Sequence, residues 1–325
     1  MSYSPFNQNP IIKFDAVTRK FGSQVALDNV SYEVPPGVVF ALLGENGAGK
    51  TTSIKSILGM CEPNAGQVTV LGMHPMARSF DIRQQIGYVP EQPSLYDWMT
   101  VQEAGWFAAG FYPGGYQDEY ERLAESFGLP LGQKLKNLSK GMRAKVVLAL
   151  SMAHRPPLLI LDEPTSGLDT LVRREFLESM VDMTAAGQTV YLSSHQIPEV
   201  ERVADIVAIM KHGKLLLIEE LSELKDTCRE VIITYEDQVN VTGIPGTLVH
   251  HDVQGRQSIC MIRTDEEEQF YRMQERSEVR TVDVRRPSLE DIFVAYMKAD
   301  RGGSLATKAG QSLGQSGSGQ SEVVR

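Results

Sequence analysis

Short apolar runs recur along the chain, separated by turns rich in glycine and proline or by longer amphipathic stretches. The runs at 38–43, 158–161 and 189–192 are almost continuously apolar, which is typical of strands buried on both faces of a sheet. Helical patterns lie between and after these runs, at 53–58, 100–111, 118–127, 144–153 and 171–183. This alternation predicts an α/β fold.

Shorter strands are expected at 11–17, 30–34, 67–71 and 86–89, where turn residues bound the apolar positions. The helix at 100–111 opens with a capping box of Thr100 and Glu103. With the helix at 118–127, it lies between two halves of the α/β core. We therefore expect a helical insert at about 100–155 within a domain that spans 1–221.

The composition changes after residue 221. Strands at 231–235, 258–263 and 279–284 and helices at 265–275 and 288–297 predict a small α+β accessory domain at 222–299. Residues 300–325 are rich in Gly, Ser and Gln, so we expect them to form a disordered tail.

The stretch GENGAGKTT at 44–52 lies between an expected buried strand and an expected helix. It matches G-x-x-x-x-G-K-[ST] at Gly44, Gly49, Lys50 and Thr51. The glycines let backbone N–H groups turn toward a phosphate, and the helix start adds partial positive charge. Lys50 is expected to reach the phosphates and Thr51 to bind Mg²⁺. The predicted ATP-binding residues of this loop are Gly44, Glu45, Asn46, Gly47, Ala48, Gly49, Lys50, Thr51 and Thr52.

Polar residues also follow two other apolar runs. Asp162 and Glu163 come after 158–161, and His195 follows 189–192. The carboxyl ends of parallel strands form the edge where ligands bind in open α/β sheets. Successive side chains of a strand point to opposite sides, so the two carboxylates are expected to differ in role. One can hold Mg²⁺ while the other faces a water.

Three further positions are ambiguous from the residues alone. Phe21 is expected either to stack on a base or to lie in the core, and the core is the commoner place for a lone aromatic. Ser139 offers either a second anion site at a helix start or an ordinary N-cap, and the second role is commoner. The polar pair in Pro90-Glu91-Gln92-Pro93 favours a plain surface turn.

Composition narrows the class of protein. Of 325 residues, 42% are hydrophobic and 22% charged, as in soluble globular proteins. The net charge of −9 disfavours a nucleic-acid binder. No apolar run approaches the roughly 18–20 residues that span a bilayer, and no signal peptide is expected. Cys61, Cys228 and Cys260 are scattered, so we expect reduced cytosolic thiols and no zinc site.

Taken together, the motifs resemble those of the ATP-binding subunits of ABC transporters over about residues 11–221. In chain order they are GENGAGKTT (Walker A), LSKGM (signature), LLILDEP (Walker B), SGLD (D-loop) and SSH (switch histidine). The resemblance implies a P-loop ABC ATPase core with an antiparallel β subdomain and the helical insert. It also implies ATP and Mg²⁺ as cofactors.

The resemblance assigns roles to the polar residues at the sheet edge. Glu163 is expected to act as general base, with Lys50 and His195 as catalytic residues that contact phosphate. Thr51 and Asp162 are expected to hold Mg²⁺. Glu91 stands where most members of the family carry a glutamine, and Gln92 comes one place later. Either can serve the Mg²⁺ and water site, and we assign Glu91 to it.

The resemblance also reverses the interpretation of two ambiguous positions. It places Phe21 on the adenine ring, at a position that is commonly Tyr. It makes Ser139, Lys140 and Gly141 a signature that contacts the γ-phosphate of ATP held by a second copy, and it makes Asp169 a bridge between the copies. LSKGM departs from the commoner LSGGQ, but the serine and the central glycine remain.

The expected function is ATP hydrolysis in a homodimer that powers export through a separate membrane permease, at the inner face of the cell membrane. The segment PSLEDIFVAYM at 287–297 resembles the last segments of the C-terminal domains of bacterial exporter subunits. Trp106, Phe107 and Phe111 of the insert are expected either to receive a permease helix or to pack in the core. One alternative is a soluble ABC ATPase that acts on DNA, on ribosomes or in regulation. The other is an ATP sensor without turnover, which Glu163 argues against.

Overall fold

The computed structural model describes residues 9–112, 114–237, 239 and 243–299. The tail expected at 300–325 lies outside the described residues. Among those that are described, no helix is both long and apolar enough to cross a membrane. The three cysteines are buried, and none forms a disulfide in the part of the chain that is described.

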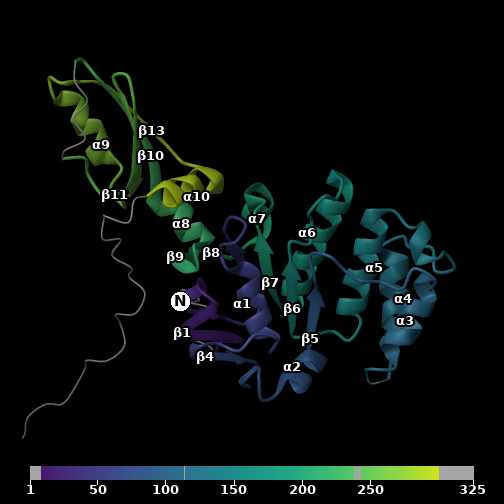
Figure 1. Ribbon diagram of the computed structural model, residues 1–325. Coiled ribbons are helices and arrows are strands. Elements are labelled where there is room, and N and C mark those ends of the chain that lie inside the picture. Colours follow the sequence, from purple (N-terminus) through teal and green to yellow (C-terminus); the bar gives the residue numbers. More distant parts are fainter. Residues whose placement is uncertain (1–8, 113, 238, 240–242, 300–325) are drawn as a thin grey trace, which may run out of the picture.

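A six-stranded sheet forms the centre of the molecule (Figure 1), and five of its strands are parallel. Its order is β5 (Ile86–Val89), β6 (Leu158–Asp162), β7 (Thr189–Ser194), β3 (Val39–Leu43), β8 (Ile206–Lys211) and β9 (Lys214–Glu220). The last strand, β9, is antiparallel to β8. All residues of β3, β6 and β7 are buried, which explains why their sequences are apolar without alternation. Neither β8 nor β9 was among the expected strands.

Side chains of β3 enter two different cores. Val39, Ala41 and Leu43 pack on one face with α6 (Thr170–Ala185) and α7 (Ile197–Val203). Phe40 and Leu42 pack on the other face with α1 (Lys50–Ile57) and with the antiparallel sheet. The central sheet is therefore covered on both sides, and its carboxyl edge remains free to hold a site.

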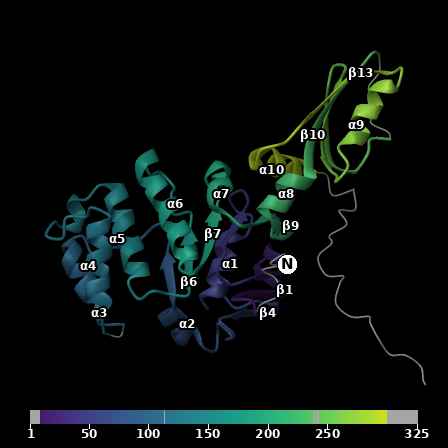
Figure 2. The same cartoon turned by 180° about the vertical axis from the view of Figure 1, so that it is seen from behind.

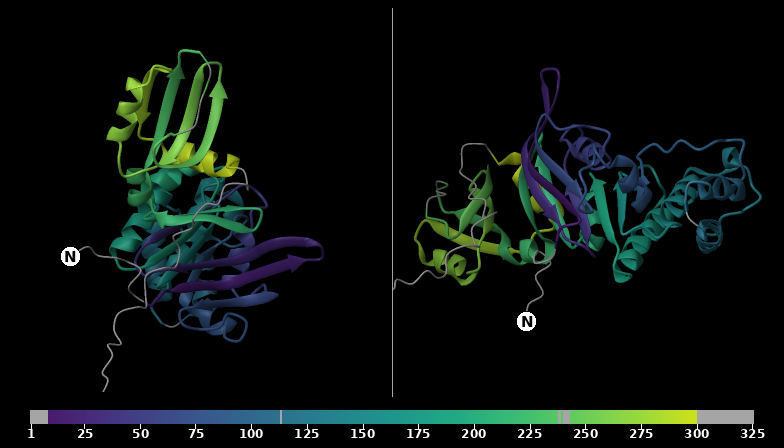
Figure 3. Two further views of the ribbon diagram at one scale, coloured as in Figure 1. Left: turned by 90° about the vertical axis from the view of Figure 1, so that its left-hand side faces the viewer. Right: turned by 90° about the horizontal axis from the view of Figure 1, so that it is seen from below.

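The antiparallel sheet has the order β2 (Gln24–Val34), β1 (Ile12–Phe21) and β4 (Ala65–Val70). Its hairpin projects from the body (Figure 3). The predicted strands 11–17 and 30–34 are too short, because β1 and β2 continue to a tight turn at Gly22, whose φ is 58°. Tyr32 of β2 stacks on Phe40 with ring centroids 5.5 Å apart and shares a 2.8 Å hydrogen bond with Tyr191 of β7. These aromatic contacts fix the hairpin against the central sheet.

The helical insert forms its own core at one end of the molecule (Figures 1 and 2). It contains α3 (Val101–Ala109), α4 (Tyr116–Ser126), a 3₁₀ turn (Leu135–Asn137) and α5 (Lys140–Met152). The predicted capping box of Thr100 and Glu103 is confirmed. The start predicted for α5, residue 144, is four residues late because Ser139 accepts a hydrogen bond from the Met142 amide and caps the helix earlier. A short helix not predicted from the sequence, α2 (Ser79–Gln85), precedes β5.

The C-terminal residues form a third sheet at the opposite end of the molecule (Figures 1 and 2). Its order is β11 (Thr247–Gln254), β12 (Gln257–Arg263), β10 (Cys228–Tyr235) and β13 (Val279–Arg285). The helix α9 (Glu268–Arg272) and the 3₁₀ turn Met273–Glu275 pack on one face. The edge strand β11 was not predicted, because its pattern of His, Asp and Val residues lacks regular alternation.

The central sheet and the C-terminal sheet are joined by α8 (Leu221–Thr227). The domain boundary expected between residues 221 and 222 therefore falls in the first turn of this helix. The last helix, α10 (Leu289–Lys298), returns to pack against α7. Ile292 and Phe293 of α10 belong to the same hydrophobic core as Ile197 and Val200 of α7. Arg263 of β12 also pairs with Glu219 of β9 through two 2.5 Å contacts. The C-terminal sheet is therefore attached to the central sheet by both apolar and charged contacts.

Candidate functional site

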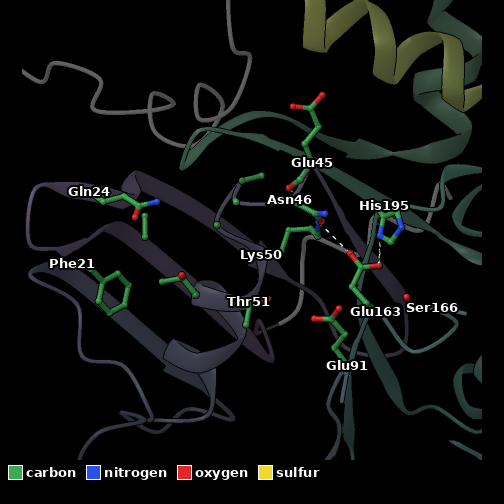
Figure 4. A pocket seen from close by; sticks show the side chains of 15 residues that line it. Phe21, Gln24, Glu45, Asn46, Lys50, Thr51, Glu91, Glu163, Ser166 and His195 are labelled. Carbon is green, nitrogen blue, oxygen red and sulfur yellow. Dashed lines mark hydrogen bonds and ion pairs between the residues drawn. The ribbon is translucent and has the colours of Figure 1, made fainter. Parts of the chain in front are cut away.

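The loop between β3 and α1 lines a pocket of about 520 Å³ at the carboxyl edge of the central sheet (Figure 4). Polar side chains from β6, β7 and the segment after β5 converge on the same pocket. Its lining comprises Phe21, Gln24, Ala26, Glu45, Asn46, Gly47, Ala48, Gly49, Lys50, Thr51, Thr52, Glu91, Glu163, Ser166 and His195. Most of the site residues predicted from the sequence therefore line one pocket.

Two glycines of this loop are required by the close approach of other backbone. Gly49 has a φ of 113°, and a Cβ there would lie 2.6 Å from the Ala26 carbonyl oxygen. A Cβ on Gly44 would lie 2.7 Å from the Met210 carbonyl oxygen. Gly44 itself is not among the lining residues, so its part in the site is to allow this packing and to accept a hydrogen bond from Lys50.

The helix α1 starts at Lys50, three residues before the predicted start at 53. Gly49 is its N-cap and has no side chain to accept from the first amides. The amides at the start of α1 therefore have no side-chain cap, and the positive end of the helix dipole points into the pocket. This arrangement suits the binding of a phosphate group.

Lys50 is only 6% exposed and lies between the loop and the strand ends. Its Nζ donates to the Gly44 carbonyl oxygen at 2.6 Å and lies 3.2 Å from Glu163 Oε1. A buried ammonium group needs such partners, and phosphate oxygens can serve as partners of the same charge-assisted kind. These contacts hold the Lys50 ammonium group at the phosphate loop, where it can contact a bound nucleotide.

Glu163 follows β6 directly and is 9% exposed. Its φ of 49° is unusual for a residue with a side chain, so the surrounding structure must hold it there. His195 Nδ1 lies 2.7 Å from Glu163 Oε2, and the His195 amide donates to the same oxygen at 3.2 Å. Glu163 Oε1 is buried without a hydrogen-bond partner among the described residues, apart from its ion pair with Lys50. Lys50 therefore holds one oxygen of this carboxylate and His195 holds the other.

The neighbouring carboxylate points elsewhere, as the strand geometry predicts. Asp162 is 3% exposed and accepts a 2.5 Å hydrogen bond from Ser193 Oγ. It is not among the lining residues of the pocket. The two carboxylates therefore have separate partners and can take separate roles.

Phe21 lies at the far end of the pocket from Lys50 (Figure 4). Its side chain is 47% exposed, so the alternative that it is a core residue is wrong. The Arg19 guanidinium lies 4.5 Å from the ring centroid and covers one face. A planar base can stack on the ring at the pocket while the triphosphate extends toward Lys50.

Comparisons with known proteins agree with this geometry. A family profile described as "ABC transporter" matches residues 27–166. A probable multidrug ABC transporter ATP-binding protein of Escherichia coli is 38% identical over 66% of this chain, which spans only 38% of that relative's length. The Nod factor export ATP-binding protein I of Rhizobium etli is 30% identical, over 87% of this chain and 92% of its own.

A solved ATP-binding subunit of an ABC transporter superposes with a TM-score of 0.62 at 32% identity, over 66% of this chain and 92% of its own. The chain belongs to the ABC transporter ATP-binding family. It is an ABC ATPase, and its parallel sheet, antiparallel sheet and insert form the P-loop fold of that family.

The oxygen atoms around the phosphate loop of this ABC ATPase fit Mg²⁺, which prefers carboxylates, hydroxyls and substrate phosphates. Thr51 and Glu91 both line the pocket, whereas Gln92 does not. The alternative that residues 90–93 form only a surface turn does not account for the place of Glu91 in the lining of the pocket. Burial raises the pKa of Tyr88 to about 12, with further contributions from the charges of Asp162 and Glu91. Mg²⁺ would offset this concentration of negative charge.

The signature residues lie outside the pocket of their own chain. Ser139 is an N-cap, so its simpler interpretation is confirmed within one chain. Lys140 Nζ donates to the Ser166 carbonyl oxygen at 2.9 Å, and Gly141 faces Val172 of α6. Asp169 caps α6 by accepting from the amides of Leu171 and Val172. One chain thus does not bring its signature to its own phosphate loop.

Three lining residues were missed by the sequence analysis: Gln24, Ala26 and Ser166. Gln24 pairs with Phe21 across the hairpin turn, so recognition of the turn at Gly22 would have indicated it. Ser166 is the first residue of the SGLD motif, of which only Asp169 was assigned a role. Each lies three residues from a position that was assigned a role, Gln24 from Phe21 and Ser166 from Glu163.

Replacing Phe21 with Ala should weaken ATP binding by about 5- to 150-fold, the equivalent of roughly 1–3 kcal/mol of lost base stacking. Phe21→Tyr keeps the ring and should bind ATP normally. Tripolyphosphate lacks a base, so its affinity should not change in either variant. Competition against a fluorescent nucleotide measures all three. Equal losses for ATP and tripolyphosphate in Phe21→Ala would show that the ring does not stack on the base.

Proposed function

We propose that the chain hydrolyses ATP at a site completed by a second copy. The observation that carries this is the position of Glu163, with Lys50 at one carboxylate oxygen and His195 at the other. A buried carboxylate beside a phosphate loop is placed to orient and deprotonate a water. Mg²⁺ would be held by Thr51 and Glu91, which line the pocket, and by Asp162, which is next to Glu163 but does not itself line the pocket, and it would offset phosphate charge.

The same geometry gives Lys50 two alternative partners. In the structure, its ammonium group lies 3.2 Å from Glu163 Oε1. Phosphate oxygens would compete for this charge, because they form charge-assisted hydrogen bonds as the Glu163 carboxylate does. ATP binding would therefore draw Lys50 toward the phosphates and leave Glu163 free as a base, while His195 keeps the carboxylate oriented.

The second copy supplies what one chain lacks. Ser139, Lys140 and Gly141 lie at the start of α5, where the backbone amides and the helix dipole favour an anion. They are not part of the pocket formed by their own chain. We propose that each signature contacts the γ-phosphate of ATP held by the other copy, and that Asp169 lies near the same interface.

A groove of about 460 Å³ between the insert and the core is the proposed place for a permease. It is lined by Phe107, Phe111, Tyr112 and His154, among others. Trp106, Phe107 and Phe111 are 70%, 42% and 65% exposed, so the alternative that they pack in the core is wrong. Exposed aromatic residues around an apolar groove mark a protein-binding surface.

The aromatic rings of Tyr112 and His154, which line this groove, carry no charge at neutral pH. Tyr112 stacks on His154 with ring centroids 4.4 Å apart. Burial lowers the pKa of His154, so this imidazole is neutral near pH 7. An apolar cytoplasmic helix of a permease would fit such a surface, and its docking would place this chain at the inner face of the membrane.

The direction of transport rests on similarity. The Rhizobium etli relative is described as a Nod factor export protein, and the alignment with it covers 92% of its length. We propose that this chain likewise powers export through a separately encoded permease. Purification from native membranes in mild detergent tests this. A polytopic membrane protein should co-elute and stimulate hydrolysis, whereas recovery on ribosomes or DNA would favour a soluble ABC ATPase instead.

Replacing Phe111 with Asp should leave basal hydrolysis intact and reduce permease-stimulated hydrolysis by about 10-fold or more, since a buried Phe contributes roughly 1.5–3 kcal/mol. The comparison variant is Tyr271→Asp, which makes the same kind of change at an exposed aromatic of α9. Both rates are measured with and without the co-purified partner. If Phe111→Asp and Tyr271→Asp respond alike to the partner, the groove is not its docking site.

A further inference from the structure

A buried carboxylate outside the pocket connects α7 to the segment that carries Glu163. Glu199 lies in α7, four residues after His195, and is 8% exposed. Its Oε2 accepts a 2.5 Å hydrogen bond from Thr165 Oγ1. Its Oε1 lies 2.9 Å from Nη1 of Arg173 in α6. Both partners of this carboxylate thus belong to the loop at 163–169 or to the helix that follows it.

This loop is held from outside at two points. Thr165 is 3% exposed and lies two residues after Glu163. Arg173, which pairs with Glu199, also donates from Nη2 to the Leu168 carbonyl oxygen at 3.1 Å. Within the loop, the Ser166 amide donates to the Glu163 carbonyl oxygen at 3.2 Å. Glu199 therefore fixes both the side chain at 165 and, through Arg173, the backbone at 168.

His195 and Glu199 act on the same segment from neighbouring positions. His195 holds the Glu163 carboxylate itself, at 2.7 Å from Nδ1. Glu199 holds the loop that carries this carboxylate. Glu163 adopts a φ of 49°, a conformation that persists only where the surroundings fix it. The contacts of Glu199 with Thr165 and, through Arg173, with Leu168 restrain the residues that follow Glu163.

We propose that Glu199 is a positioning residue that keeps Glu163 in the orientation needed to deprotonate water. The proposal rests on the role of Glu163 as general base. Removing the Glu199 carboxylate leaves the Thr165 hydroxyl and the Arg173 guanidinium without their buried partner, so the loop shifts. Of the loop at 163–169, only Glu163 and Ser166 line the nucleotide pocket, and the phosphate loop at 45–52 makes no hydrogen bond or ion pair with Glu199 among the described residues, so ATP affinity should change little.

The test compares kcat and KM for ATP in the full chain. Glu199→Ala should lower kcat by about 10²-fold, the usual effect of displacing a catalytic group by about 1 Å, with KM unchanged. Glu199→Gln keeps an oxygen that accepts from Thr165 and should recover part of this loss. Thr165→Val removes the same hydrogen bond by a change of similar shape, and it serves if Glu199→Ala does not fold.

The matched control is Glu201→Ala, two residues further along α7. Glu201 pairs with Lys225 of α8 at 2.6 Å, and among the described residues it makes no hydrogen bond or ion pair with the loop at 163–169. Its substitution removes the same charge from the same helix and should leave kcat unchanged. An equal loss of kcat in Glu201→Ala would show that any weakening of α7 lowers turnover, and would overturn the specific role of Glu199.

A double variant separates this proposal from the one on which it rests. If Glu199 acts through Glu163, adding Glu199→Ala to Glu163→Gln should cause no further loss of turnover. Additive losses would overturn the positioning role, as would a normal kcat or a raised KM in Glu199→Ala alone. Near-normal turnover in Glu163→Gln would instead refute the general-base proposal, whatever the behaviour of Glu199.

Discussion

Glu163→Gln is expected to retain ATP binding and to lose roughly 10²–10⁴-fold in turnover, the usual contribution of a general base. The amide keeps the size and the oxygen of the carboxylate, so the contact with His195 can persist. It cannot accept a proton from water at neutral pH. Steady-state hydrolysis and equilibrium nucleotide binding on the same preparation measure the two effects separately.

The loss of turnover should depend on where the substituted carboxylate lies in the structure, and not simply on the removal of one negative charge. Glu178→Gln is a suitable comparison, because Glu178 is an exposed residue of α6 that pairs with Arg174. It makes the same chemical change at the surface and should hydrolyse ATP normally. Glu163→Gln should also accumulate ATP-bound dimers, since binding continues while hydrolysis is blocked. Near-normal turnover in Glu163→Gln would refute its role as the base.

The parts of the site that were predictable are those encoded by short segments. GENGAGKTT fixes a loop between an apolar strand and a helix, and every requirement of that loop is local in sequence. Asp162, Glu163 and His195 were predictable because each follows a buried strand. The carboxyl ends of parallel strands must share an edge, so their proximity needs no knowledge of the rest of the fold.

Other features depend on contacts between distant residues. The start of α1 at Lys50 requires Gly49 at a φ of 113°, packed against Ala26 of a separate sheet. The exposure of Trp106, Phe107 and Phe111 depends on how the insert packs, because their spacing suits a core as well as a groove. The contact of Glu199 with Thr165 joins residues 34 positions apart, and no motif indicates it.

The C-terminal sheet shows the same limit. Its strands β10, β12 and β13 were indicated by apolar alternation, whereas β11 pairs through a register shift between Leu248 and His250. The shift falls next to the adjacent histidines His250 and His251, and the alternation of buried and exposed positions is interrupted there. The packing of α10 on α7 was equally unpredictable, because an amphipathic helix does not specify which apolar surface it will cover.

A mixture of two inactive variants is expected to recover hydrolysis. Lys50→Ala removes a buried charge from the phosphate loop, and homodimers of it should bind ATP poorly. Ser139→Arg places a bulky side chain at the start of α5, which does not line the pocket of its own chain, and homodimers of it should bind ATP but not close. In a heterodimer, the intact phosphate loop of the Ser139→Arg chain faces the intact signature of the Lys50→Ala chain.

Because the two composite sites of a symmetric dimer are equivalent, random mixing should restore roughly one quarter of the normal rate, if each site works independently. Hydrolysis is measured as the ratio of the two chains is varied, and it should be greatest at equal amounts. A mixture of each variant with itself at the same total concentration gives the background. Size-exclusion chromatography of Glu163→Gln with ATP provides an independent measure of dimer formation. If mixing restores nothing and ATP never promotes dimers of Glu163→Gln, each chain must complete its site alone, and Ser139 must act only as the cap of α5 that it forms in this structure.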